Sequence, residues 1–422
     1  GEKVRELLTP DRGTLAARVS SLSKELGSIQ QREGHYLKIL TSLKDKINNQ
    51  LENPKNDFAQ DLNGWLEATL NEPVLAKKSS QLLTKDTLLK MVAAQVHLMP
   101  TGHEYFIEGN NSILESGLSA GLALNYGCSN GNCGKCKAKL ISGDVKNIKQ
   151  HDYTFSEAEK NQNYILTCCN TAVTDVVLQA DEAGSEYDIP VQNINAKVKK
   201  VSPLDDNLLL LHLKTPRTNR LRFFAGQNAA LKIDGIDGEE SFAIASCPCD
   251  DMNIQFHVKR DTDSELVSHL FDNIANNENI KIEGPTGHFV LKEDSERPIL
   301  FIAFNESFAP VKSLIEHAMT LDHAEYIHLF WITTDSNTHY MHNQCRAWTD
   351  ALDNFRYTPL KIKDGNNDDL LKDRLEQIAQ AYPKLSEFDI YVDGSESLTN
   401  KTIQFLKDAG GEENNIITRI EN

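Results

Sequence analysis

Three cysteines stand close together in the stretch NYGCSNGNCGKCKAKL. Cys128, Cys133 and Cys136 have the spacing C-x4-C-x2-C, and glycines lie between and beside them. Thiolates bind zinc and iron–sulfur clusters, and glycine lets the backbone approach closely enough for its N–H groups to reach sulfur. Two further thiols follow at Cys168 and Cys169. The spacing predicts a [2Fe–2S] site, because two irons need four thiolates and one of these two cysteines would supply the fourth.

Other metal sites fit the cysteines less well. Structural zinc usually takes two close pairs of ligands, and the first cysteine group contains only one C-x2-C pair. A Rieske centre needs two histidines, and none accompanies these cysteines. Cys247 and Cys249 flank Pro248. They have no partner pair elsewhere, so we expect them to be small buried residues and not metal ligands.

The second cysteine segment, ILTCCNTAVTDVVL, resembles the plant-type ferredoxin family. In that family the fourth ligand follows a short apolar run with threonine and stands seven residues before an Asp-hydrophobe strand. Cys168 stands in this relation to Asp175. The resemblance covers residues 92–185 and implies an α+β β-grasp domain, with Cys169 as a small buried neighbour. The ligands that it implies are Cys128, Cys133, Cys136 and Cys168.

The rest of the chain predicts three more parts. Short alternating strands at close spacing over residues 190–293 favour an antiparallel β-barrel. Strands and helices alternate over 297–422, which is typical of a parallel sheet covered by helices, as in nucleotide-binding α/β domains. Residues 1–91 read as a helical module. A heptad-like stripe over 14–51 predicts a coiled coil or helical hairpin for self-association or partner binding, and a long helix packing on its own chain is the alternative.

Charge and composition restrict the partners. The 422-residue chain has a net charge of −17, which argues against nucleic-acid binding. Residues 1–96 are close to neutral, so the acidic excess falls on the later domains and predicts a redox partner with a basic docking surface. No apolar run is long enough to span a membrane, and the clustered cysteines suggest a reducing, cytoplasmic compartment. The chain starts at Gly1 and not at Met, so an upstream anchor stays open.

A ferredoxin domain followed by a barrel and an α/β domain resembles the ferredoxin–NAD(P)H reductase superfamily. The resemblance is to its oxygenase-reductase branch, and it covers residues 190–422. The segment EGPTGHFVL matches the barrel exit of that family, and SFAIAS matches its flavin strand. The resemblance implies FAD in the barrel and NAD(P)H on the α/β domain.

The flavin residues depart from the family pattern. The family motif is Arg-x-Tyr-Ser, and here the four positions read Glu-Ser-Phe-Ala from Glu240. A carboxylate repels the flavin phosphate that arginine would bind, and Ala243 lacks the serine hydroxyl. Phe242 still offers a ring for stacking. In the second phosphate motif, Gly-x-x-Ser, Ser268 is kept and Glu265 replaces the glycine.

The nicotinamide side departs further. The family loop is Gly-Gly-Thr-Gly-x-Ala-Pro, and residues 304–310 read FNESFAP. We expect Phe304 to close the approach to the backbone, and Glu306 to satisfy the helix dipole that a phosphate would otherwise meet. Asp393 stands where the family has cysteine.

These departures lead to a functional expectation with two alternatives. The main one is a [2Fe–2S] electron-transfer or redox-responsive protein whose reductase-like half has lost NAD(P)H binding and serves as a scaffold or docking module. FAD binding is disfavoured but left open, with Phe242 and Ser268 as its contacts. The first alternative is a flavin-dependent NAD(P)H reductase that feeds an oxygenase-type partner through the cluster. The second is a cluster-based redox sensor.

Overall fold

The computed structural model describes residues 94–107, 110–261, 263–321, 324–334, 338–363 and 368–419. The predicted helical module and its coiled coil lie outside these residues. None of the helices in the described ranges is both long and apolar enough to cross a membrane.

The described residues form two compact units. The first combines the described residues up to Ser116 with Leu140–Ile148 and Asn170–Leu178. The second combines Gly117–Lys139, Lys149–Cys169 and the described residues from Gln179 onward. All eight cysteines of the chain therefore belong to the second unit.

The predicted β-grasp fold is confirmed by a five-stranded sheet in the order β2-β1-β7-β3-β5 and a two-stranded sheet of β4 and β6. In β1, Val96 and Leu98 are buried while their neighbours are more exposed, as the alternation QVHLM predicts. The strands are β1 (Gln95–Met99), β2 (Glu104–Phe106), β3 (Lys137–Ser142), β4 (Val145–Asn147), β5 (Tyr164–Leu166), β6 (Asn170–Ala172) and β7 (Val176–Gln179). The helices are α7 (Ile113–Ser119) and α8 (Glu157–Asn161).

The predicted antiparallel barrel is also confirmed. Its six strands run in the order β11-β10-β13-β8-β9-β12, and a bridge between Ile244, just after β11, and Phe256 in β12 joins the two ends. Inward-facing side chains such as Ile194 and Ile282 fill the interior. The elements are β8 (Gln192–Asp205), β9 (Leu208–Lys214), β10 (Asn228–Lys232), β11 (Glu240–Ala243), β12 (Asn253–Lys259), β13 (Asn279–Thr286) and α9 (Glu265–Asp272).

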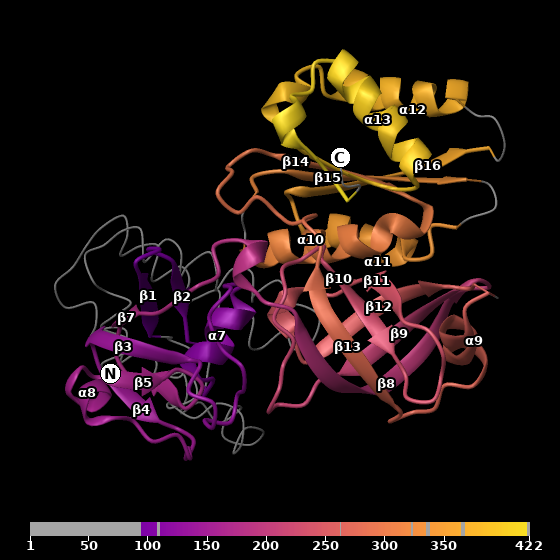
Figure 1. Ribbon diagram of the computed structural model, residues 1–422. Coiled ribbons are helices and arrows are strands. Elements are labelled where there is room, and N and C mark those ends of the chain that lie inside the picture. The colour runs from indigo at the N-terminus through magenta and orange to yellow at the C-terminus, as the bar shows by residue number, and fades with distance from the viewer. Residues whose placement is uncertain are drawn as a thin grey trace, which may run out of the picture. The chain divides into compact units, whose positions relative to one another are not determined.

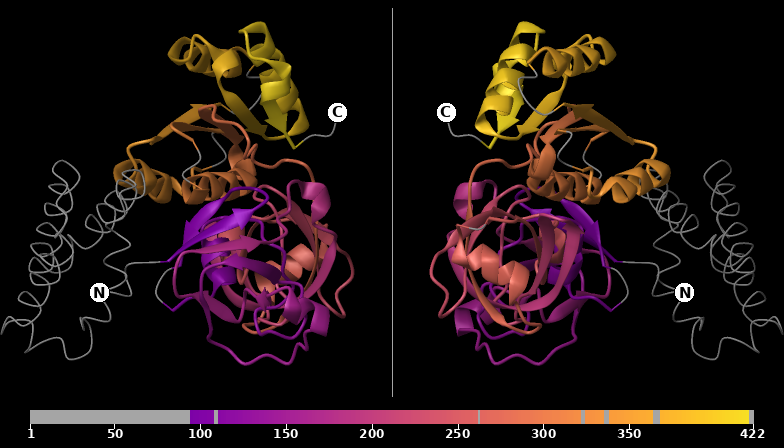
Figure 2. Two further views of the ribbon diagram at one scale, coloured as in Figure 1. Left: turned by 90° about the vertical axis from the view of Figure 1, so that its left-hand side faces the viewer. Right: turned by 90° about the vertical axis from the view of Figure 1, so that its right-hand side faces the viewer.

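The C-terminal part is the predicted α/β layer structure. Five parallel strands run in the order β16-β15-β14-β17-β18. Helices α10 and α11 cover one face of this sheet, and α12 and α13 cover the other (Figures 1 and 2). The central strand β14 is buried along its whole length, as strands covered on both faces are. The strands are β14 (Ile299–Phe304), β15 (Ile327–Thr334), β16 (Phe355–Ile362), β17 (Asp389–Asp393) and β18 (Ile416–Thr418). The helices are α10 (Phe308–Leu321), α11 (His342–Ala351), α12 (Asp368–Ala381) and α13 (Glu396–Asp408).

Candidate functional site

The four predicted ligands lie together as two pairs of thiols. The Sγ atoms of Cys136 and Cys168 are 3.2 Å apart, and both residues are buried. Cys128 and Cys133 form the second pair, and each thiol influences the pKa of the other. Cys133 is exposed. Two pairs match a cluster of two irons, in which each iron takes two protein ligands.

Local hydrogen bonds explain why Cys168 reaches Cys136. Strand β5 pairs with the start of β3, directly after the cysteine loop. Thr167 then donates its backbone N–H and its hydroxyl to the carbonyl oxygen of Cys136, at 3.1 and 3.0 Å. The next residue in the chain is therefore held against Cys136. Cys169 is also buried, with its Sγ 3.6 Å from that of Cys168.

Backbone donors surround the thiols of Cys128 and Cys133, which we call the outer pair; Cys136 and Cys168 are the inner pair. Burial raises the pKa of Cys128, but the backbone N–H groups of Cys133, Asn130 and Asn132 outweigh it and bring the pKa to about 7. The N–H of Lys135 donates to the Cys133 Sγ over 3.5 Å. Such donors stabilise thiolate, which is the form that binds metal. The donor set therefore fits an anionic iron–sulfur cluster.

Cys136, in the pair that it forms with Cys168, is poor as a free thiolate. The hydrogen bond that Cys136 donates to Cys168, and then burial, raise the pKa of Cys136. Only a bound cation would make a thiolate favourable in such a place. Within the described residues, no three His, Cys, Asp or Glu side chains gather as a site for a single metal ion. A cluster of two irons does not need such a group, since two thiolates serve each iron.

Two glycines of the loop are needed for its shape. Gly131 and Gly134 have positive φ values of 83° and 72°. A Cβ atom on Gly131 would lie 2.6 Å from the Sγ of Cys169, and one on Gly134 would lie 2.2 Å from the ring of Tyr153. The loop can therefore close over its cysteines only where these side chains are absent.

Alanine at Gly134 is expected to lower cluster content, because the left-handed backbone and the contact with Tyr153 destabilise the loop by about 1–3 kcal/mol. Iron and acid-labile sulfide per chain measure the effect. Gly127→Ala is the matched control, since its Cβ would meet mainly the flexible side chain of Lys135. Equal loss of iron in both variants would contradict the role given to Gly134.

Tyr126, which stands just before the cysteine loop, takes part in a buried ionic group. Tyr126 donates its hydroxyl hydrogen bond to Asp251, and Arg220 Nε donates to the same carboxylate at 2.8 Å. Arg220 and Asp251 are 3% and 1% exposed. Burial, and then the charge of Asp251, raise the pKa of Tyr126. All three residues belong to the second unit, so the base of the loop is fixed to the barrel within one compact body.

The flavin-strand residues line an open cavity of about 470 Å³. Phe242 and Glu240 lie on its wall, whereas Ser268, a half-buried residue of α9, is not among the lining residues. Three cations that the sequence analysis did not single out also line it: Lys259, Arg260 and Arg419.

These cations bear on the argument that Glu240 repels the flavin phosphate. Acidic lining residues, which include Glu306, are matched by an equal number of basic ones in the same cavity. Lys259 forms an ion pair with Glu306, and Arg260 lies over the ring of Phe271 at 4.3 Å and pairs with Asp272. The cavity therefore presents basic as well as acidic side chains, and Lys259 and Arg260 are each paired with a carboxylate. Two of these cations, Lys259 and Arg260, stand in the sequence segment VKR at the end of β12, which is the signal that could have revealed them.

The turn after β14 begins with a left-handed residue. Phe304 is 2% exposed and packs in the core of the α/β layers, below the turn. Asn305 adopts a φ of 48°, a left-handed conformation in which asparagine is tolerated almost as well as glycine. Its side-chain Oδ1 accepts from the N–H of Thr334. The turn therefore contains a left-handed asparagine in the segment where the family loop has glycines.

A buried histidine faces the cavity with one nitrogen unused. His257 is 7% exposed, and its Nδ1 lies 3.0 Å from the hydroxyl of Tyr340. Burial lowers the pKa of His257 to about 3, so the ring is neutral. Its Nε2 has no hydrogen-bond partner among the described residues. A buried polar atom at a cavity wall fits a bound polar ring system, such as the isoalloxazine of FAD.

Comparison with known proteins adds independent findings. A family model described as "2Fe-2S iron-sulfur cluster binding domain" matches residues 96–174. A second, "Oxidoreductase FAD-binding domain", matches residues 195–291. Protein RfbI of Salmonella typhimurium is 31% identical over 306 residues, which cover 71% of this chain and 88% of that protein. The chain belongs to the family of ferredoxin-domain reductases.

Two reductases are also similar to this chain. The CDP-6-deoxy-L-threo-D-glycero-4-hexulose-3-dehydrase reductase of Yersinia pestis is 28% identical over 72% of this chain and 91% of its own length. The reductase component of propane 2-monooxygenase from Rhodococcus jostii is 23% identical over 75% of this chain and 88% of its own length.

The expected loss of NAD(P)H and flavin binding is not supported. The FAD-binding model matches across the barrel in spite of the altered motif, and the relatives are reductases. Electron transfer by an iron–sulfur reductase is the function common to these findings, and the first alternative fits them better than the scaffold interpretation.

Proposed function

We propose that this protein is a flavin-dependent NAD(P)H reductase that passes electrons through a [2Fe–2S] cluster to a partner protein. The observation that carries the proposal is the open cavity beside Phe242 in a barrel that matches the FAD-binding model. FAD, when bound, takes two electrons from NAD(P)H and releases them singly, as a one-electron cluster requires. Cys128 and Cys133 would hold one iron, and Cys136 and Cys168 the other.

The lining residues have separate roles in this proposal. Phe242 offers a ring face for stacking, and the neutral His257 offers Nε2 as a hydrogen-bonding atom. Lys259 and Arg260 stand in for the missing arginine of the flavin motif and bind the phosphates. Phe242 therefore keeps the role predicted for it, and Ser268 does not line the cavity and has no contact role here.

The partner is proposed from the charge of the chain and from its relatives. The later domains carry the acidic excess of the chain, which favours a partner with a basic docking surface. The relatives include a reductase component of a monooxygenase, so an oxygenase-type partner is the class we favour. A reducing, cytoplasmic compartment suits a cluster held by thiolates.

The test uses the full chain, purified with its cofactors. Acid extraction should release FAD, and addition of NADH or NADPH should bleach the cluster absorbance on the timescale of turnover with an electron acceptor. A chain that holds iron and sulfide but contains no flavin, and takes none up when FAD is added, would overturn the reductase proposal in favour of a scaffold or sensor.

Removing the cavity cations is expected to weaken flavin binding. Charge-assisted hydrogen bonds contribute about 1.5–3 kcal/mol each, so Lys259→Ala with Arg260→Ala should raise the Kd for FAD at least about tenfold. Fluorescence titration of the flavin-depleted chain measures this. Lys281→Ala is the control, because Lys281 pairs with Asp234 and does not line the cavity. An unchanged Kd in the double variant would contradict the phosphate role.

A further inference from the structure

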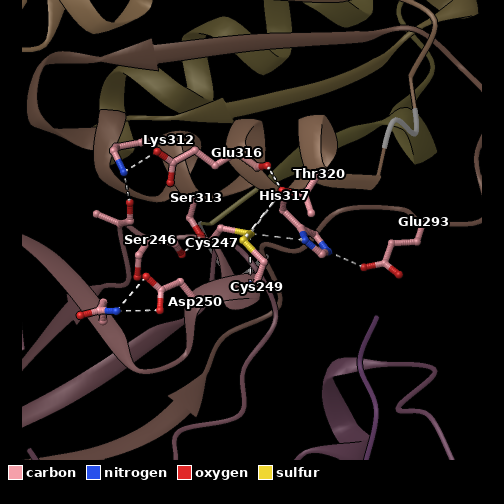
Figure 3. The surroundings of a disulfide bond; sticks show 12 residues. Ser246, Cys247, Cys249, Asp250, Glu293, Lys312, Ser313, Glu316, His317 and Thr320 are labelled. Atoms are coloured by element: carbon pink, nitrogen blue, oxygen red, sulfur yellow. Dashed lines mark hydrogen bonds and ion pairs between the residues drawn. A yellow bond between two sulfur atoms is a disulfide. The ribbon is translucent and has the colours of Figure 1, made fainter. Parts of the chain in front are cut away.

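The sequence predicts Cys247 and Cys249 as small buried residues, but the structure joins them in a disulfide. They flank Pro248 at the start of the turn η2 (Pro248–Asp250), and the bond closes a loop with a single residue between the two cysteines. Figure 3 shows this disulfide against helix α10, with His317 and Thr320 directed toward it. All of these residues belong to the second unit.

A structural purpose accounts poorly for this bond. The stabilisation that a disulfide gives through the unfolded chain grows with the length of the loop that it closes, and this loop is nearly the shortest available. The backbone here is already held by α10 without it. Lys312 Nζ donates to the carbonyl of Ala245 at 2.8 Å, and Ser313 Oγ donates to that of Ser246 at 2.6 Å.

The groups around Cys247 suit a sulfur that becomes a thiolate. The backbone N–H of Cys249 donates to the Cys247 Sγ at 3.2 Å. His317 Nδ1 lies 4.0 Å from the same sulfur, and the hydroxyl of Thr320 lies 3.8 Å from both sulfurs. His317 is 1% exposed, and its Nε2 lies 2.8 Å from Glu293 Oε1, which orients the ring. An oriented imidazole and an N–H donor are what stabilise a leaving thiolate.

Access to the two sulfurs differs. Cys247 is 6% exposed, whereas Cys249 is only partly buried. A thiolate from solution therefore meets Cys249 first, and Cys247 becomes the leaving group. In the reducing compartments of most cells, protein disulfides are usually transient and take part in catalysis or redox sensing. The proposed electron route from flavin to cluster uses neither sulfur.

We propose that Cys247 and Cys249 form a reversible thiol–disulfide site that exchanges with low-molecular-weight thiols. A small thiolate attacks the Sγ of Cys249, the sulfur–sulfur bond breaks, and Cys247 leaves as thiolate. A second small thiolate attacks the outer sulfur of the mixed disulfide and releases Cys249 as thiolate together with the small disulfide. Two small thiols are oxidised, the protein disulfide gains two electrons, and two protons pass to the protein thiolates.

Peptide mapping of the full chain tests the proposal. The chain is isolated in air without reductant, treated with N-ethylmaleimide, then incubated folded with glutathione and labelled with iodoacetamide. The peptide that contains Pro248 should gain two iodoacetamide labels after glutathione and none before. Cys345 is a buried free thiol and serves as the internal control for unfolding. Titration with glutathione and its disulfide should give one midpoint in both directions.

Single variants test the direction of attack. Cys247→Ser leaves Cys249 as the free thiol, and Cys249→Ser leaves Cys247. The thiol in the first variant should react with 5,5′-dithiobis(2-nitrobenzoate) at least about tenfold faster, because thiol exchange depends on access. Two free thiols in the air-isolated chain, or a disulfide that glutathione reduces only together with exposure of Cys345, would overturn the proposal. Faster reaction at Cys247 would overturn the assigned direction. Flavin content has no bearing on either result.

Discussion

Serine in place of Cys168 is expected to leave the protein without its iron–sulfur cluster. The Cys168 Sγ is 3.2 Å from that of Cys136, and Thr167 holds the two residues together. A serine hydroxyl is a harder and far less acidic ligand than a thiol, so the inner iron would lose half of its protein ligands. Iron and acid-labile sulfide should fall from about two each per chain to well below one.

The neighbouring thiol provides the matched control. Cys169 is equally buried and next in sequence, yet its predicted role is packing. Cys169→Ser should keep the visible absorption and most of the iron, with a modest loss of stability from burying a hydroxyl. The assignment would be wrong if Cys169→Ser lost the cluster while Cys168→Ser kept it.

The second large effect is expected at Asp251. Removal of one partner from a buried ion pair leaves an uncompensated charge, which typically costs about 3–5 kcal/mol. In Asp251→Asn, Arg220 would stay buried and lose its contact with this carboxylate, and the Tyr126 hydroxyl would lose its charged acceptor. The free energy of unfolding of the second unit should fall by about 3 kcal/mol or more. Chemical denaturation followed by cluster absorbance and intrinsic fluorescence measures it.

A surface pair calibrates the measurement. Arg260 and Asp272 also form an Arg–Asp contact, at 3.3 Å, but their side chains are 37% and 54% exposed. Such pairs contribute about 0–1 kcal/mol, so Asp272→Asn should change stability little. Equal effects of the two substitutions would show that burial does not set the strength of the Asp251 contacts.

Sequence alone was sufficient for the elements with strong local patterns. The spacing of Cys128, Cys133 and Cys136 and the period-two strands of the barrel depend on residues close in the chain. The resemblance at Asp175 placed the fourth thiol at Cys168, and the structure sets this thiol beside Cys136.

The chemistry of the cavity was harder to predict from the sequence, because its lining residues come from distant segments of the chain. Glu240 taken alone predicts repulsion of phosphate, while Lys259, Arg260 and Arg419 come to the same cavity from β12, the residue after it and the C-terminal end of the described chain. A motif comparison at four positions cannot show such compensation. Asn305 is a second example, since it takes a left-handed backbone conformation although it is not glycine.

The four proposed ligands differ in exposure, and this difference affects the rate of electron transfer. Of the four proposed ligands, three are buried and Cys133 alone is exposed. Protein that covers a redox centre slows electron transfer to other molecules, because electron tunnelling slows steeply with distance. In the proposed reductase, the protein that covers the cluster is thinnest at Cys133. A partner is then selected by how near its own redox centre comes to this point, and molecular oxygen, which needs no docking, competes for electrons there whenever the partner is absent.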